Sequence, residues 1–108
     1  MKEYHYECDG GAIAIGTRSA TVNICNGIGD GRHKVKVYDL NEAFDDTGYN
    51  FIGAVEGSHI NVYNYDCLKP EDKRNKNCIL CTLKGRYAIY TLDHSGIIVL
   101  RQWDKEGY

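Results

Sequence analysis

Cys78 and Cys81 form the one cysteine pair in the chain that is separated by two residues. Thiolates at this spacing can share a tetrahedral zinc ion when the residues between them form a tight turn. Here the intervening and following residues are apolar or β-branched, which indicates a strand, and strand positions three apart face opposite sides of a sheet. The other cysteines, Cys8, Cys25 and Cys67, are isolated. We therefore expect buried, mostly reduced structural thiols and no metal ligands.

The segment Asn26–His33 is the densest run of glycine in the chain. Backbone amides in such a segment could bind a phosphate, with Arg32 and Lys34 adding positive charge. The segment lacks the Lys-Ser/Thr ending of a P-loop, and its glycine spacing fits neither a dinucleotide-binding fingerprint nor an EF-hand. We expect it to be a loop that connects two strands.

Asp93-His94-Ser95 places the three residue types of a hydrolase triad side by side. A triad needs these groups to converge in space, and three consecutive residues cannot reproduce that geometry. We expect a turn here, with Gly96 supplying conformational freedom. None of the four histidines stands near a suitable acid and metal partner in the sequence, so we expect no catalytic residues, no cofactor and no enzyme activity.

Length and composition set limits on the class of protein. The chain has 108 residues, of which 43% are hydrophobic and 26% charged, as expected for one globular domain spanning residues 1–108. A formal net charge of −2 provides no overall basic field for nucleic acid. The polar N-terminal segment and the absence of an apolar run near the roughly 20 residues of a membrane helix predict a cytoplasmic protein without membrane contact.

Short alternating or β-branched segments recur between glycine-containing turns, which is typical of a β-sandwich or β-barrel. We predict an all-β fold, a small antiparallel β-barrel or β-sandwich of about nine short strands joined by hairpins. Periodicity does not encode strand order, so the choice between the two architectures stays open. The expected strands are residues 3–8, 12–17, 20–25, 34–39, 51–56, 58–65, 78–83, 86–92 and 97–103. Helical character is limited to single turns at 41–45 and 70–74.

Glycines mark most of the expected turns. Gly10 and Gly11 join the first two strands, Gly57 separates 51–56 from 58–65, and Gly85 separates 78–83 from 86–92. Each of these pairs of strands is therefore expected to be a hairpin.

Alternation within the strands predicts two faces. The core-facing residues share a spacing of two within a strand and are Ile13, Ile15, Val22, Ile24, Val35, Val37, Ile60 and Val62. The opposite face is rich in tyrosine, and the chain has nine Tyr against two Phe. Candidate binding residues on that face are Tyr38, His59, Asn61, Tyr63, Tyr65, Arg86 and Tyr90.

Tyrosine is amphipathic, so it can cover a wet surface and hydrogen-bond to a partner. We expect a non-enzymatic protein-binding module, an inhibitor or regulator that occupies a partner protein with this face or forms a homodimer through it. The alternative structural interpretation is a solvent-exposed sheet face or a second core layer. The alternative function is nucleotide or single-stranded nucleic-acid binding, with Tyr63, Tyr65 and Tyr90 stacking on bases and Lys34, Lys36 and Arg86 binding phosphate.

Charge is segregated along the chain despite its small total. Four carboxylates lie in one acidic segment, namely Asp39, Glu42, Asp45 and Asp46. Four cations lie in one basic segment, namely Lys69, Lys73, Arg74 and Lys76. Both segments suit a solvated surface, and they could also form the rim that steers a charged partner.

Overall fold

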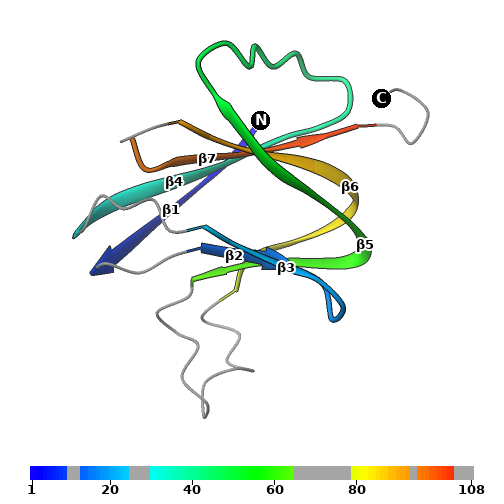
Figure 1. Cartoon of the computed structure of the whole chain (residues 1–108), viewed down its shortest axis with the longest axis horizontal. Helices are drawn as coiled ribbons and strands as arrows, with labels where there is room; N and C mark the ends of the chain where they lie inside the picture. The colour runs from blue at the N-terminus through cyan, green and yellow to red at the C-terminus, as the bar shows by residue number, and fades with distance from the viewer. Residues whose placement is uncertain (10–12, 25–29, 65–78, 93–94, 104–108) are drawn as a thin grey trace.

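The computed structural model describes residues 1–9, 13–24, 30–64, 79–92 and 95–103. These residues form one mixed seven-stranded sheet and contain no helix (Figure 1). The strands are β1 (Lys2–Asp9), β2 (Ile13–Gly16), β3 (Thr21–Ile24), β4 (Asp30–Tyr38), β5 (Asn50–Asn64), β6 (Ile79–Leu92) and β7 (Ile97–Gln102). Their spatial order is β1-β4-β7-β6-β5-β2-β3, in which only β4 and β7 run parallel. The described part of the chain holds no helix of the length and apolarity needed to cross a membrane.

The structure confirms the all-β class but not the nine strands, and it shows neither a closed barrel nor two separate sheets. One open sheet is present instead, with β1 and β3 as its two outer strands. The expected hairpins at Gly57 and Gly85 are wrong, because these two glycines are cross-strand partners within the long strands β5 and β6. Four expected short strands are thus two long ones.

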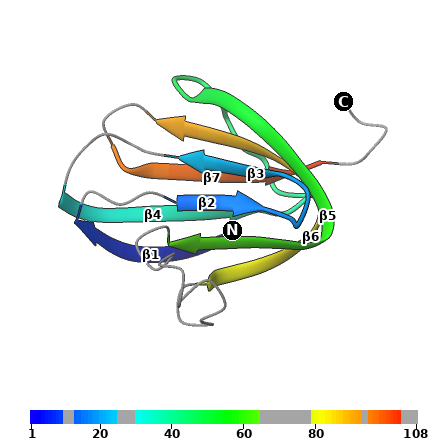
Figure 2. The same ribbon diagram turned by 60° about the horizontal axis from the view of Figure 1, so that its bottom comes forward.

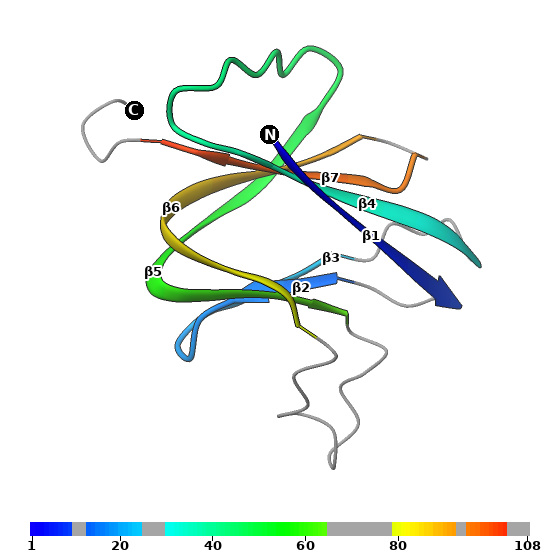
Figure 3. The same cartoon turned by 180° about the vertical axis from the view of Figure 1, so that it is seen from behind.

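Strands β5 and β6 bend together (Figures 2 and 3). The first half of β5 and the second half of β6 lie with β7, β4 and β1, whereas the second half of β5 lies with β2 and β3. Their register shifts between Gly57 and Ile60, and such a bulge bends and twists a strand. At the same place Gly85 has a φ of 125°, a conformation that residues with a Cβ rarely adopt. The glycines therefore permit a bend rather than a chain reversal.

The hydrophobic core fills the space between the two halves of the bent sheet. All eight predicted core residues belong to it, with Val22 partly buried and the other seven buried. The second half of β6 and β7 supply Tyr87, Ile89, Ile98 and Leu100 from the other side. Because the bend brings both halves over the same apolar side chains, one sheet encloses its own core.

Three further expectations differ from the structure. β1 pairs with β4 rather than with β2, because apolar alternation does not specify which strand is the neighbour. Residues 30–33 of the expected glycine-rich loop belong to β4, where they pair with residues 6–9 of β1, and residues 25–29 lie outside the described residues. Residues 41–45 form no helical turn, and residues 70–74 also lie outside the described residues.

Candidate binding surfaces

Residues 39–49 connect β4 to β5 and carry Phe44 onto the face of β4 and β6 that points away from the core. The Phe44 ring centroid lies 4.9 Å from that of Tyr38, 5.1 Å from Tyr49 and 5.3 Å from Tyr90. Phe51 extends the group, with its centroid 5.6 Å from Tyr90. These separations and their tilted or edge-on geometries are those of favourable aromatic pairs. We call Tyr38, Phe44, Tyr49, Phe51 and Tyr90 the aromatic cluster.

Hydrogen bonds to β7 hold the start of this connecting segment against the sheet. The Arg101 guanidinium donates to the carbonyl oxygens of Asp39, at 3.2 Å, and Leu40, at 3.3 Å. The Leu40 N–H donates to the Gln102 side-chain oxygen at 3.3 Å. Further along, the Asp45 carboxylate accepts from the Thr47 N–H at 3.0 Å and from its hydroxyl at 2.6 Å. The segment is therefore tied to β7 and has ordered local turns of its own.

The aromatic cluster lies beside a second apolar layer on the outer side of the sheet. Val99 and Ala88 are fully buried although their strand positions face away from the core. Phe51, the cross-strand partner of Tyr90 at this layer, is 54% exposed, and the next residue along β5, Ile52, is 40% exposed. Ile52 is the extra residue of a bulge between Phe51 and Gly53, so it has no partner position on β6. The margin of the layer therefore presents apolar side chains to solvent.

The connecting segment is also acidic. Asp39, Glu42, Asp45 and Asp46 lie within it, and residues 39–49 include no lysine or arginine. Two hydrogen bonds lower the pKa of the Glu42 carboxyl. The larger effect comes from the terminal amine of Met1 and the smaller from the Asp39 N–H. Hydrogen bonds from the Thr47 hydroxyl and N–H lower the pKa of Asp45. Both carboxyls are thus kept ionised, and the aromatic cluster has a negatively charged border.

The bend divides the predicted tyrosine-rich face between the two halves of the sheet. Tyr38 and Tyr90 lie together in the aromatic cluster, whereas His59, Asn61 and Tyr63 lie beyond the bend on the second half of β5. Tyr65 lies outside the described residues. Among the described members of the set, His59 is exposed and Tyr38, Asn61, Tyr63 and Tyr90 are partly exposed, and the structure does not bring them together as one surface.

Arg86, the remaining predicted site residue, lies between Glu56 and Trp103. Its Nε is 3.7 Å from a Glu56 carboxylate oxygen, and its guanidinium carbon lies 5.1 Å from the centroid of the Trp103 ring. The backbone N–H of Trp103 also donates to the Arg86 carbonyl at 3.1 Å. Arg86 therefore packs the end of β7 against β6, and it contributes no contact to the aromatic cluster.

Sequence reasoning missed Phe44, Tyr49, Phe51 and Ile52 as members of the surface. Strand alternation predicts the side of a residue only inside a strand, and Phe44 and Tyr49 lie in the connecting segment. A usable signal was the presence of two aromatic residues inside an otherwise polar, acidic stretch, because such side chains need an apolar surface to cover them.

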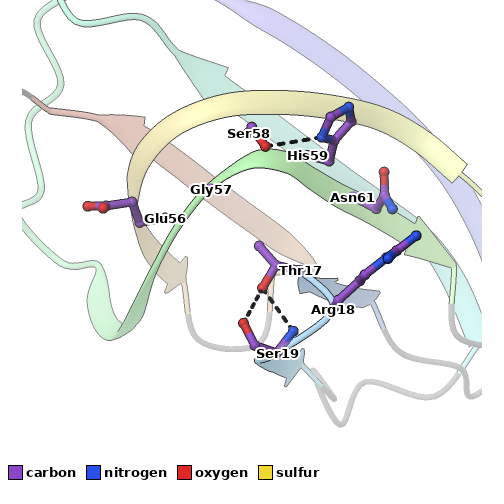
Figure 4. A pocket seen from close by; sticks show the side chains of 8 residues that line it. All are labelled: Thr17, Arg18, Ser19, Glu56, Gly57, Ser58, His59 and Asn61. Carbon is purple, nitrogen blue, oxygen red and sulfur yellow. Dashed lines mark hydrogen bonds between the residues drawn. The ribbon is translucent and has the colours of Figure 1, made fainter.

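A cleft of about 690 Å³ lies at the bend, between the β2–β3 turn and the bulge of β5. Thr17, Arg18 and Ser19 line one side of it, and residues 56–59 and Asn61 line the other (Figure 4). The Thr17 hydroxyl bonds to the Ser19 N–H at 3.3 Å and to the Ser19 hydroxyl at 3.2 Å. The Ser58 hydroxyl lies 3.1 Å from His59 Nδ1. Hydroxyl, imidazole, amide and guanidinium groups thus line the same cleft.

Cys81 is a free, half-buried cysteine that faces the core beside Tyr4. Burial raises the pKa of its thiol to about 11, although a hydrogen bond with Tyr4 opposes this effect. Its sequence partner Cys78 lies outside the described residues, as do Cys25, Cys67 and the predicted turn residues Asp93 and His94. Within the described ranges, no group of three His, Cys, Asp or Glu residues is arranged to hold a metal ion.

Comparison with protein-family models, with curated proteins and with solved structures finds no match to this chain. Its function is therefore inferred from its own residues and their arrangement.

Proposed function

We propose that this protein is a non-enzymatic protein-binding module that inhibits or regulates a partner by covering part of its surface. The aromatic cluster, together with Ile52, is the contact surface. The observation that carries this proposal is the exposure of Phe51, at 54%, and Ile52, at 40%, at the margin of an apolar layer separate from the core. Aromatic side chains that are large and rigidly supported are frequent energetic centres of protein interfaces.

The acidic border indicates the chemistry of the partner. Four carboxylates lie in the connecting segment with Phe44. Glu42 contacts the terminal amine of Met1, and the Arg101 guanidinium bonds to the backbone of Asp39 and Leu40, so Asp45 and Asp46 supply most of the negative charge of the border. Complementary charge at an interface rim accelerates association and disfavours partners of like charge. A partner that is apolar at the centre of its contact surface and basic at its rim fits this protein. A second copy of the chain fits less well, because two acidic borders would meet across the twofold axis.

The proposal for a nucleotide or single-stranded nucleic acid on Tyr63, Tyr65 and Tyr90 has weaker support. Tyr90 packs in the aromatic cluster, whereas Tyr63 lies beyond the bend. Two of the three cations in that scheme have carboxylate neighbours. The Lys34 ammonium lies 3.5 Å from Glu3, and Arg86 lies beside Glu56. The partner-protein proposal is therefore preferred.

The test combines capture from the native host with matched variants. Phe51→Ser with Ile52→Ser removes the exposed apolar margin on β5. Ile79→Ser removes a similarly exposed isoleucine, 38% against 40% for Ile52, from the start of β6, where it pairs with Tyr63. We expect a captured protein to be retained by wild type and by Ile79→Ser, and to be lost by about tenfold or more with the double variant. The association rate is then measured between this protein and the purified partner. Asp45→Asn and Asp46→Asn should lower this rate, and added salt should lower it for the wild type.

Two results would contradict the proposal. In the first, the double variant retains every protein that the wild type captures. In the second, sedimentation shows a homodimer of the wild type that the same double variant dissociates, because the surface would then be a self-association interface.

A further inference from the structure

Cationic side chains gather at the bend of β5 and β6, although the chain as a whole is acidic. The 690 Å³ cleft and a neighbouring cleft of about 440 Å³ share the residues Glu56, Gly57 and Ser58. Arg18 and His59 line the larger cleft, and Lys84 and Arg86 line the smaller one. Glu56 is the one carboxylate among the described residues that line either cleft. With His59 neutral, the two clefts together hold three cations, Arg18, Lys84 and Arg86, against the one carboxylate of Glu56, while the net charge of the chain is −2.

Arg18 is the principal cation of the larger cleft. It is exposed at the tip of the β2–β3 turn, and it makes no salt bridge with any residue in the described ranges. Its guanidinium extends toward Asn61 on β5, whereas the His59 ring points away from Arg18 (Figure 4). The Glu56 carboxylate points away from these groups and lies 3.7 Å from Arg86 instead. Arg18 therefore retains its charge and its hydrogen-bond donors for a ligand.

The neighbouring polar groups supply further donors. When the Ser58 hydroxyl donates to His59 Nδ1, the ring proton is on Nε2, which can then donate to a ligand. The Asn61 side-chain oxygen accepts from the Thr82 hydroxyl at 3.0 Å, so its amide nitrogen is the atom left for a further bond. The Arg18 guanidinium and the Asn61 amide come from two segments and lie on facing sides of the cleft, and a guanidinium beside a further N–H donor suits a phosphate group.

We propose that this cleft binds an organic phosphate monoester of about nucleotide size, with Arg18 and the Asn61 amide nitrogen on the phosphate. The size follows from the volume, because small-molecule sites are usually about 300–1,000 Å³ and a free phosphate ion would fill little of 690 Å³. Thr17 and Gly57 form the base of the cleft, and a Cβ at Gly57 would lie 2.8 Å from the Thr17 methyl carbon. This site shares no residue with the aromatic cluster and is independent of the proposed function.

The test is a titration of the full chain followed by the backbone amide resonances in NMR, at constant ionic strength. The three probes are adenosine 5′-monophosphate, adenosine and inorganic phosphate. We expect saturable shifts for residues 17–19 and 56–61 with the monophosphate, weaker binding of inorganic phosphate and none of adenosine. Arg18→Ala should weaken binding of the monophosphate by about tenfold or more, because a charged hydrogen-bond donor is lost.

Lys84→Ala is the matched control, because it removes an exposed cation from the neighbouring cleft and leaves the proposed contacts in place. It should change the affinity little, and Phe51→Ser with Ile52→Ser should leave it unchanged. The proposal is overturned if no probe shifts these two segments, if adenosine binds as well as its monophosphate, or if Lys84→Ala weakens binding as much as Arg18→Ala. Equal affinity for inorganic phosphate and the monophosphate would overturn the assignment of an organic ligand.

Discussion

Replacement of Gly57 by alanine tests how the bend of β5 is built. An alanine Cβ at this position would lie 2.8 Å from Thr17 Cγ2, whereas unstrained carbon contacts are about 3.5–4.0 Å. Rotation of Thr17 would not relieve the clash freely, because its hydroxyl is bonded to the Ser19 N–H and hydroxyl. Either the turn moves by about 1 Å or those bonds break. Overpacking of this kind costs about 1–3 kcal/mol.

The net effect on the free energy of unfolding includes a favourable contribution. Replacing glycine by alanine restricts the unfolded chain and stabilises the fold by about 0.4–1 kcal/mol where the backbone conformation is compatible. We therefore expect Gly57→Ala to lower the free energy of unfolding by about 1–2 kcal/mol. Gly53→Ala is the control on the same strand, because its Cβ would meet only Val22 Cγ2, at an ordinary 3.9 Å. That variant should be neutral or slightly more stable.

Thr17→Ser provides the second half of the experiment, because it removes Cγ2 and keeps the hydroxyl bonds to Ser19. The coupling energy is measured by urea unfolding of four proteins: the wild type, Gly57→Ala, Thr17→Ser and the double variant. The fluorescence of Trp103, the single tryptophan, follows the unfolding. We expect the alanine at Gly57 to cost little in the serine background, which gives a coupling of about 1–2 kcal/mol. Equal stability of Gly57→Ala and Gly53→Ala, or an unchanged penalty with Thr17→Ser, would refute this account of the bend.

Two further predictions concern the aromatic cluster and Cys81. Phe44→Ala should lower the free energy of unfolding by about 2 kcal/mol, because it removes three ring contacts, whereas Phe51→Ala removes one and should cost less than about 1 kcal/mol. Urea unfolding checks this, and equal costs would contradict the central position of Phe44. With the pKa of Cys81 raised from 9.0 to about 11, the unfolded chain loses the thiol proton at lower pH than the folded chain. Stability should therefore fall as pH rises between about 9 and 11, and Cys81→Ala should show a smaller fall when urea midpoints are measured in reductant.

Local patterns predicted which residues form strands and which of them face the core. Ile13, Ile15, Val35, Val37 and their counterparts on β3 and β5 lie where alternation placed them. This succeeds because strand side chains alternate with a fixed period of two, so a short segment carries the information by itself. The expected strands 12–17 and 20–25 correspond to β2 and β3, which are adjacent both in the chain and in the sheet.

A glycine can have either of two structural roles, and the local sequence does not distinguish them. A glycine between two apolar segments allows a turn, and it equally allows a bulge and a bend inside one long strand. Whether Gly57 and Gly85 form turns or bends depends on their pairing with each other. This pairing across β5 and β6 satisfies the hydrogen bonds of both backbones and places the two halves of the sheet around one core. The same dependence on distant partners put β1 beside β4 rather than β2.

For the candidate sites too, the sequence determined some features and the tertiary structure decided others. The amino-acid sequence by itself determined the all-β class, most strand positions, the core-facing residues and the acidic character of residues 39–49. Only the tertiary structure placed Phe44 on Tyr38 and Tyr90, separated these tyrosines from His59, Asn61 and Tyr63, and brought Arg18 to the bulge of β5. The physical reason is range: periodicity and charge act between chain neighbours, whereas binding surfaces arise where the bend brings distant segments together.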